Sequence, residues 1–132
     1  MTKKILIADD DPIIIKLLQV NLELDGYEVV TAEDGAEAVE RAAETKPDLI
    51  ILDIMMPRMD GWTALQELKR QPETAKAPVI LLSAKAQQED IRKGYEAGAA
   101  EYFTKPFDPS DLLSAIEQIL AGTYKRPDVP RR

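Results

Sequence analysis

Five short apolar runs alternate along the chain with five longer amphipathic stretches. The runs consist mainly of Ile, Val and Leu, and most lack the alternation of apolar and polar residues that marks a half-exposed strand. Such continuous runs are typical of strands in a parallel sheet that is buried on both faces. The pattern predicts strands over residues 5–8, 27–31, 49–52, 79–82 and 101–104.

The stretches between the runs carry apolar residues at the spacing of amphipathic helices. Asp11 and Pro12 supply an N-cap and a first helical residue, and Gly26 supplies a helix end. Comparable signals bound the other stretches, so the predicted helices cover residues 12–25, 34–45, 62–70, 86–97 and 109–121.

The same spacing predicts which helical side chains face the sheet. In the first helix the predicted apolar face consists of Ile13, Leu17, Val20 and Leu24. In the later helices the corresponding residues are Ala36, Val39, Ala43, Leu65, Leu68, Ile91, Tyr95, Leu112, Leu113, Ile116, Ile119 and Leu120.

Five strand–helix units within 132 residues predict one doubly wound α/β domain with a five-stranded parallel sheet. We expect this domain to cover residues 1–122. Residues 123–132 carry a net charge of +3, which leaves −10 for the rest of the chain. We expect them to form a basic C-terminal tail or linker stub that is solvated.

Composition excludes several function classes. The sequence contains no Cys and no His, which excludes disulfides, thiol catalysis, Ser-His-Asp triads and histidine metal ligands. A net charge of −7 disfavours direct nucleic-acid binding. The apolar run near the N-terminus is too short for a signal peptide or a membrane span, so we expect a cytoplasmic protein without membrane contact.

Charged and polar residues follow the predicted strands at one end of the sheet, where ligands bind in doubly wound folds. Asp9 and Asp10 follow the first strand, Asp53 the third, Ser83 the fourth and Lys105 the fifth. Like charges gathered there repel one another and need a compensating cation or shifted pKa values. Carboxylate oxygens suit Mg²⁺ (or Mn²⁺), and the loop after the first strand lacks the glycines of a nucleotide-binding loop.

One reaction accounts for this set of residues. The Asp53 carboxylate is a candidate nucleophile that forms an aspartyl phosphate, while Lys105 and Ser83 contact the phosphoryl oxygens. Taken singly, an Asp after a strand is more often a helix cap or a turn, and Asp11 and Asp60 are interpreted in that way.

Four segments, ILIADDDP, LIILDIMMPRMDG, PVILLSA and YFTKPF, resemble the receiver domain of bacterial two-component response regulators. The resemblance covers about residues 3–121. It implies a flavodoxin-like sheet of order 2-1-3-4-5 with five helices. It also implies a cis peptide bond between Lys105 and Pro106.

The resemblance assigns a role to each residue of the site. It implies that Asp53 is the phosphoacceptor and that Mg²⁺ is held by Asp9, Asp10, Asp53 and the backbone carbonyl of Met55. Lys105 is then the phosphate-binding lysine. Ser83 and Tyr102 are then the switch residues.

The implied function is a signalling switch, not an enzyme beyond its own phosphorylation and slow autodephosphorylation. A histidine kinase or phosphotransfer protein donates the phosphoryl group, and a downstream protein or fused output domain is regulated. The changing face comprises the fourth helix, fifth strand and fifth helix, with candidate contacts at Gln87, Gln88, Ile91, Tyr95, Glu101 and Tyr102.

One feature bears on the oligomeric state, and two alternative functions stay open. Ile91, Ala97 and Ala115 are uncharged where the winged-helix branch of the family has a charged dimer network, so we expect a monomer or a weak phosphorylation-dependent dimer. One alternative is a pseudo-receiver that binds partners without phosphorylation. The other is a haloacid-dehalogenase-type phosphatase with Asp9 as nucleophile, which leaves the segment LDIMMPRMDG unexplained.

Overall fold

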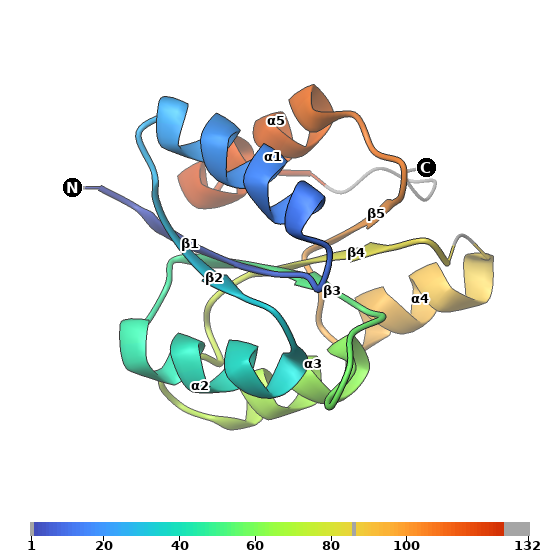
Figure 1. Cartoon of the computed structure of the whole chain (residues 1–132). Helices are drawn as coiled ribbons and strands as arrows, with labels where there is room; N and C mark the ends of the chain where they lie inside the picture. The colour runs from blue at the N-terminus through green and yellow to red at the C-terminus, as the bar shows by residue number, and fades with distance from the viewer. Residues whose placement is uncertain (1, 86, 126–132) are drawn as a thin grey trace.

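Each apolar run forms a parallel strand of one sheet. The computed structural model describes residues 2–85 and 87–125 (Figure 1). The strands are β1 (Lys4–Ala8), β2 (Glu28–Ala32), β3 (Leu49–Asp53), β4 (Val79–Ser83) and β5 (Glu101–Thr104). They lie in the order β2-β1-β3-β4-β5, and every adjacent pair is parallel. The predicted fold class and strand order are therefore confirmed.

The helices follow the strands at the predicted positions: α1 (Pro12–Leu24), α2 (Gly35–Thr45), α3 (Gly61–Arg70), α4 (Gln88–Glu96) and α5 (Pro109–Ala121). Four of them begin at an aspartate whose carboxylate accepts a hydrogen bond from the first turn, which satisfies a backbone donor that the helix leaves unpaired. These N-caps are Asp11, Asp34, Asp60 and Asp108.

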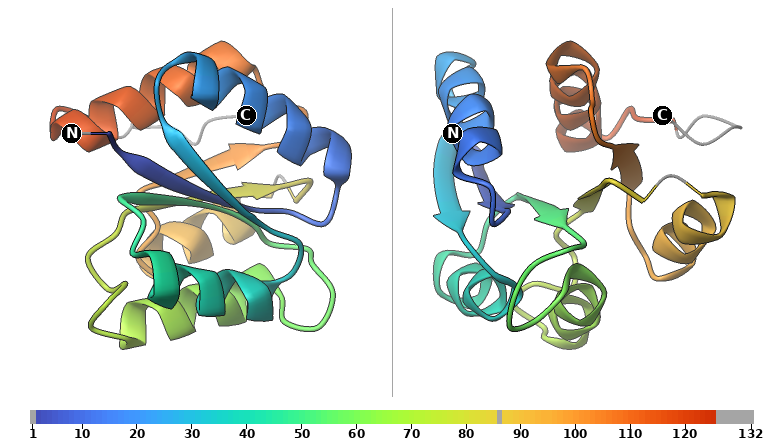
Figure 2. Two further views of the ribbon diagram at one scale, coloured as in Figure 1. Left: turned by 60° about the vertical axis from the view of Figure 1, so that its left-hand side comes forward. Right: turned by 45° about the vertical axis from the view of Figure 1, so that its right-hand side comes forward.

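The helices form two layers around the sheet. Figures 1 and 2 show α1 and α5 on one face, with α2, α3 and α4 on the other. Each face has its own apolar core. Leu18, Leu22, Leu112 and Ile116 pack with Ile5, Ile7, Ile51 and Leu82 on the α1/α5 side. On the opposite side Ala38, Ala42, Leu65, Leu68 and Ile91 pack with Leu6, Ile50, Leu52 and Leu81.

The predicted core face of α1 is wrong. Ile13 and Leu24 are 75% and 80% exposed, and Leu17 and Val20 are also exposed. The core side chains are instead Leu18 and Leu22, with Ile14 and Ile15 packed beside them. The helix is apolar on most of its circumference, so two sets of positions satisfy helical spacing equally well.

Helix α2 shows a similar displacement. Its buried residues are Gly35, Ala38 and Ala42, whereas Ala36 is exposed. Alanines on neighbouring faces of this helix do not distinguish the core side by size or polarity. In α3, by contrast, Leu65 and Leu68 are the only Leu residues, and both are fully buried as predicted.

The segment after α5 departs from the expected solvated tail within its described part. Tyr124 is half-buried against the α1/α5 core, and its hydroxyl donates a hydrogen bond to the Glu101 carboxylate. The remainder of the predicted tail, residues 126–132, lies outside the described residues. Among the residues that are described, no helix is long and apolar enough to cross a membrane.

Candidate functional site

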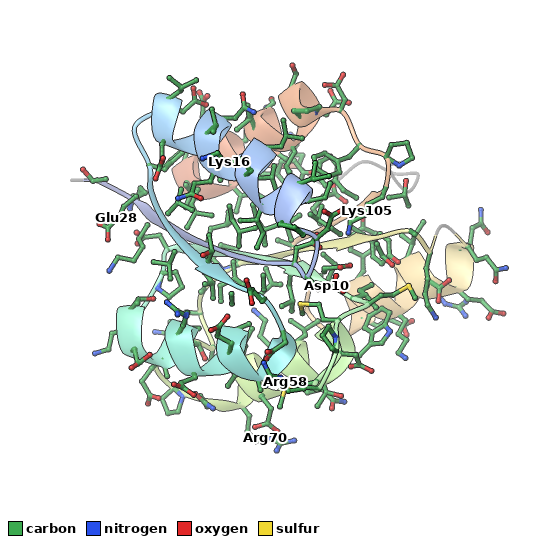
Figure 3. The ribbon with its side chains drawn as sticks, in the orientation of Figure 1. Asp10, Lys16, Glu28, Arg58, Arg70 and Lys105 are labelled. Atoms are coloured by element: carbon green, nitrogen blue, oxygen red, sulfur yellow. The ribbon has the colours of Figure 1, made fainter. Side chains whose placement is uncertain are left out.

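The carboxyl ends of four parallel strands converge on one edge of the sheet and place the predicted residues together. Asp53 and Ser83 are the last residues of β3 and β4, whereas Asp9 and Lys105 directly follow β1 and β5. Figure 3 shows Asp10 and Lys105 at this same end of the sheet. The site therefore combines residues that are almost a hundred positions apart in the sequence.

Three carboxylates form the centre of the site. Asp9, Asp10 and Asp53 each offer an oxygen, and these oxygens lie within 4.8 Å of one another. Asp9 is fully buried and Asp53 is 3% exposed, while Asp10 faces solvent. Close carboxylates in a low-dielectric setting repel strongly, and hard divalent cations prefer oxygen ligands. The donor set therefore fits a divalent cation such as Mg²⁺.

Lys105 partly neutralises the cluster. Its ammonium lies 3.0 Å from Asp9 Oδ2 and 3.3 Å from Asp53 Oδ2. Burial lowers the pKa of Lys105, but its hydrogen bond to Asp9 and the charges of Asp53 and Asp9 outweigh this effect and raise the pKa overall. Lys105 therefore stays a cation beside Asp53, where it can contact an anion bound to that carboxylate.

Asp53 lies in an environment that disfavours its charged form. Burial, followed by the negative charge of Asp9, raises the pKa of Asp53 from 3.8 to about 6, against the opposing effect of Lys105. One of its oxygens accepts a hydrogen bond of 3.2 Å from the Met55 backbone N–H. An ionised Asp53 therefore lowers the free energy of unfolding, and a bound cation offsets this loss.

This cost predicts a pH-dependent gain in stability for Asp53→Asn in the absence of metal. Because the folded pKa lies above the unfolded one, the folded state holds the proton more tightly, and wild type loses stability as pH rises from about 4 to about 6.5. Asn carries no charge, so the variant should be more stable at pH 7 by about 1–3 kcal/mol. Urea unfolding of both proteins in chelator at several pH values measures the difference.

The difference should be small near pH 4 and constant above about pH 7. Added Mg²⁺ should stabilise wild type and reduce the gap. A variant that is less stable than wild type at pH 7, or a difference that does not change with pH, would show that Asp53 is not destabilised by burial.

The loop between β3 and α3 is fixed from two sides. Gly61 approaches the strand so closely that a Cβ there would lie 2.4 Å from the Asp53 carbonyl oxygen. The Met59 carbonyl lies against Gly35, at the start of α2, so closely that a side chain at this position would clash with it. The Gly35 N–H donates a hydrogen bond of 3.1 Å to the same carbonyl oxygen. These close approaches hold the backbone around Met55, whose side chain is 55% exposed.

An ion pair that the sequence did not reveal adds to this restraint. Arg58 has a left-handed φ of 65°, and its guanidinium donates two hydrogen bonds to Asp34 Oδ2, one of them at 3.0 Å from Nε. Asp34 is 2% exposed, and the hydrogen bond from the Glu37 N–H, the largest contribution, lowers its pKa. The pairing is long-range, so no local pattern around either residue indicates it.

Asp60 lies beside the site and is the N-cap of α3, where the sequence predicted a turn without a chemical role. Its carboxylate accepts the Thr63 N–H at 2.8 Å. Asp60→Ala should lower the free energy of unfolding by about 1 kcal/mol, because a backbone donor of α3 loses its partner. Asp60→Asn should stay near wild type in the same denaturation experiment. Equal losses in the two variants would show that charge rather than capping matters at this position.

Ser83 and Tyr102 are connected through the loop after β4. Ser83 is fully buried, and its hydroxyl oxygen accepts the Lys85 N–H at 3.0 Å. Tyr102 is also fully buried, and its hydroxyl donates to the Lys85 carbonyl at 2.9 Å. Ser83 and Tyr102 therefore both contact the backbone of Lys85. The Lys105–Pro106 peptide bond that follows β5 is cis.

The predicted partner face is only partly a surface. Gln87 and Gln88 are exposed and Tyr95 is half-buried. Ile91, Glu101 and Tyr102 are fully buried, which contradicts their selection as surface contacts. Ile91 and Tyr102 pack into the core beneath α4, and Glu101 accepts hydrogen bonds at the edge of the sheet. Of the six predicted contact residues, only the two glutamines and Tyr95 therefore reach the surface in this conformation.

A pocket of about 410 Å³ adjoins the site between the loops after β3 and β4. It is lined by Ile54, Met55, Met56, Asp60, Trp62 and Lys85. The Lys93 ammonium lies 4.4 Å from the centre of the Trp62 ring, a cation–π contact between α4 and α3. Trp62 is the single tryptophan of the chain, so its fluorescence reports on this region.

Comparison with known proteins agrees with this geometry. The family model of the response regulator receiver domain matches residues 5–117. The transcriptional regulator RpaA of Synechocystis is 42% identical over 97% of this chain and 53% of its own length. Protein PilH of Pseudomonas aeruginosa is 40% identical over 90% of this chain and 98% of its own length. The crystal structure of the chemotaxis response regulator CheY4 of Vibrio cholerae is 32% identical with a TM-score of 0.84, covering 90% of this chain and 99% of that one.

The chain therefore belongs to the response regulator receiver domain family, whose members are signalling domains and not classical enzymes. It spans about half the length of RpaA and of the other transcriptional regulators that it matches. These relatives do not favour the phosphatase alternative.

Proposed function

We propose that this receiver domain is a phosphoacceptor switch that is modified on Asp53. The observation that carries the proposal is the geometry of the cluster. A buried carboxylate with a raised pKa lies within reach of a cation-binding pair of aspartates on one side and of the Lys105 ammonium on the other. Each of these groups has a use in phosphoryl transfer to Asp53.

The proposed step is a displacement at phosphorus. A carboxylate oxygen of Asp53 attacks the phosphoryl group, an O–P bond forms, and the bond from phosphorus to the donor breaks. With a phosphohistidine donor the leaving group is the imidazole nitrogen, and with acetyl phosphate it is acetate. Lys105 stays protonated and places its positive charge beside the new phosphoryl oxygens.

A divalent cation, when bound, neutralises charge on the transferring phosphoryl oxygens. Asp9, Asp10 and Asp53 would hold it, together with the backbone carbonyl of Met55 that the family resemblance implies. Asp9 Oδ1 accepts the Asp11 N–H at 2.9 Å, which orients this carboxylate toward the site.

The modification would be transmitted by Ser83 and Tyr102. A phosphoryl group adds about −1.5 to −2 charges and strong acceptor oxygens next to the Ser83 hydroxyl. Reorientation of that hydroxyl removes the acceptor of the Lys85 N–H and frees the loop that Tyr102 contacts. The proposed donor is a histidine kinase or phosphotransfer protein, and the proposed reader of the altered α4–β5–α5 face is a downstream protein or fused output domain.

Intact-mass spectrometry with acetyl phosphate as the donor tests this function. The mass of wild type should increase by one phosphoryl group when Mg²⁺ is present, and chelator should prevent the increase. An unmodified protein under both conditions would leave a domain that binds partners without phosphorylation. A modification that is insensitive to chelator would contradict the role of the aspartate cluster in cation binding.

A further inference from the structure

A second buried carboxylate lies outside the site, at the start of the edge strand β5. Glu101 is fully buried. Its Oε1 accepts the Tyr95 hydroxyl and, at 2.8 Å, the Tyr102 N–H, while its Oε2 accepts the Tyr124 hydroxyl. One carboxylate thus connects α4, β5 and the segment that follows α5. A buried charge needs such donors to remain in the fold.

The described part of the segment after α5, residues 123–125, lies beside β5 and the end of α5, with Tyr124 half-buried. The right-hand view of Figure 2 shows the chain leaving α5 and passing over the edge of the sheet near β5. A pocket of about 400 Å³ is lined there by Ala99, Ala100, Ile119, Gly122 and Tyr124. Gly122 has a left-handed φ of 78°, which ends α5 and turns the chain back toward β5.

This contact is linked to the phosphorylation site through Lys85 and Tyr102, each of which makes a hydrogen bond at two of its atoms. Ser83 accepts from the Lys85 N–H, and the Lys85 carbonyl accepts from the Tyr102 hydroxyl. The Tyr102 N–H then donates to the same carboxylate that holds Tyr124. The Tyr124–Glu101 contact is therefore present in the conformation in which the Ser83 hydroxyl accepts the Lys85 N–H. A Ser83 hydroxyl directed toward a phosphoryl group on Asp53 would lose that contact.

We propose that the segment after α5 is an intramolecular ligand of the α4–β5–α5 face, held by the Tyr124–Glu101 hydrogen bond and released when Asp53 is phosphorylated. The regulation rests on the proposed function of Asp53. A partner or a second copy of the chain that reads this face must compete with the segment, so release exposes the face only in the phosphorylated state. The coupling is reciprocal: if a phosphoryl mimic on Asp53 weakens docking, then a substitution that weakens docking must strengthen binding of the mimic.

Fluoroberyllate with Mg²⁺, titrated into the full chain and followed by Trp62 fluorescence, measures this coupling. Tyr124→Phe removes only the hydroxyl and should lower the apparent Kd of fluoroberyllate by about fivefold. Tyr27→Phe is the matched control, because Tyr27 is also half-buried but lies before the opposite edge strand, β2. It should bind as wild type does. Equal Kd values for wild type and Tyr124→Phe would overturn the coupling while leaving the proposed function intact.

Nitration by tetranitromethane, localised by mass spectrometry, tests the docking itself. Tyr124 should be nitrated slowly in wild type, and faster with Mg²⁺ and fluoroberyllate or in Glu101→Leu without them, because Leu has no acceptor for the Tyr124 hydroxyl, whereas Tyr27 should not change. Failure of wild type to bind fluoroberyllate or accept a phosphoryl group would reject the proposed function and the regulation with it. Tyr124 nitration that is no faster in a folded Glu101→Leu variant than in wild type would overturn the docking whatever the state of Asp53.

Discussion

Asp53→Asn is expected to abolish phosphorylation by acetyl phosphate while leaving the domain folded. The amide has no anionic oxygen to attack phosphorus, so the nucleophile is lost, and no other carboxylate of the cluster has the same surroundings. Asp9 is fully buried and its two oxygens accept from the Asp11 N–H and from Lys105, whereas Asp10 is exposed. Intact-mass spectrometry should therefore show a single modification in wild type and none in the variant.

Two further variants make this result specific. Asp25→Asn makes the same chemical change at an exposed position that ends α1. This variant should be phosphorylated to the same extent as wild type. Asp9→Asn should be labelled slowly and should need more Mg²⁺, because one cation ligand is missing. Labelling that persists in Asp53→Asn but disappears in Asp9→Asn would instead support the phosphatase alternative.

Leu18→Ala is expected to cost about 2–5 kcal/mol of unfolding free energy, the largest stability loss predicted here. Leu18 is fully buried in the core between α1, α5 and the sheet, where truncation leaves a cavity lined by Ile and Leu side chains. Urea denaturation followed by circular dichroism measures the loss.

Leu17→Ala is the matched control, because it makes the same truncation one residue earlier on the same helix. Leu17 is 39% exposed, so the change should cost about 1 kcal/mol, clearly less than Leu18→Ala. The reverse order of the two effects would mean that α1 presents to the sheet the face that its sequence pattern first suggested.

That contrast shows where sequence reasoning reaches its limit. The positions of β1, β3, β4 and β5 followed directly from the apolar runs, because strands buried on both faces leave no register ambiguity between core and solvent. The partly exposed edge strand β2 begins one residue later than predicted. Helix rotation did not follow for α1, since residues 13–24 are apolar at positions on every side. The connection from β1 and the requirement to cover Ile5 and Ile7 decide the rotation, and both are properties of the folded chain.

The site was easier to predict than the helix faces. Topology brings the ends of parallel strands together, so the location of Asp9, Asp53, Ser83 and Lys105 in the sequence already predicts their proximity. The Arg58–Asp34 pair and the Tyr124–Glu101 contact could not be predicted in this way. The two residues of each pair lie more than twenty positions apart, and neither of them follows or ends a strand at the site. No local pattern therefore indicates either contact.

The most direct test of the central claim identifies the residue that carries the phosphoryl group. Borohydride reduces an aspartyl phosphate to homoserine, which stays at its position through digestion and peptide sequencing by mass spectrometry. After treatment with acetyl phosphate and Mg²⁺, homoserine should be found at residue 53 and should be absent when chelator replaces Mg²⁺. Homoserine at residue 9, or at no residue, would contradict the assignment of Asp53 as the phosphoacceptor.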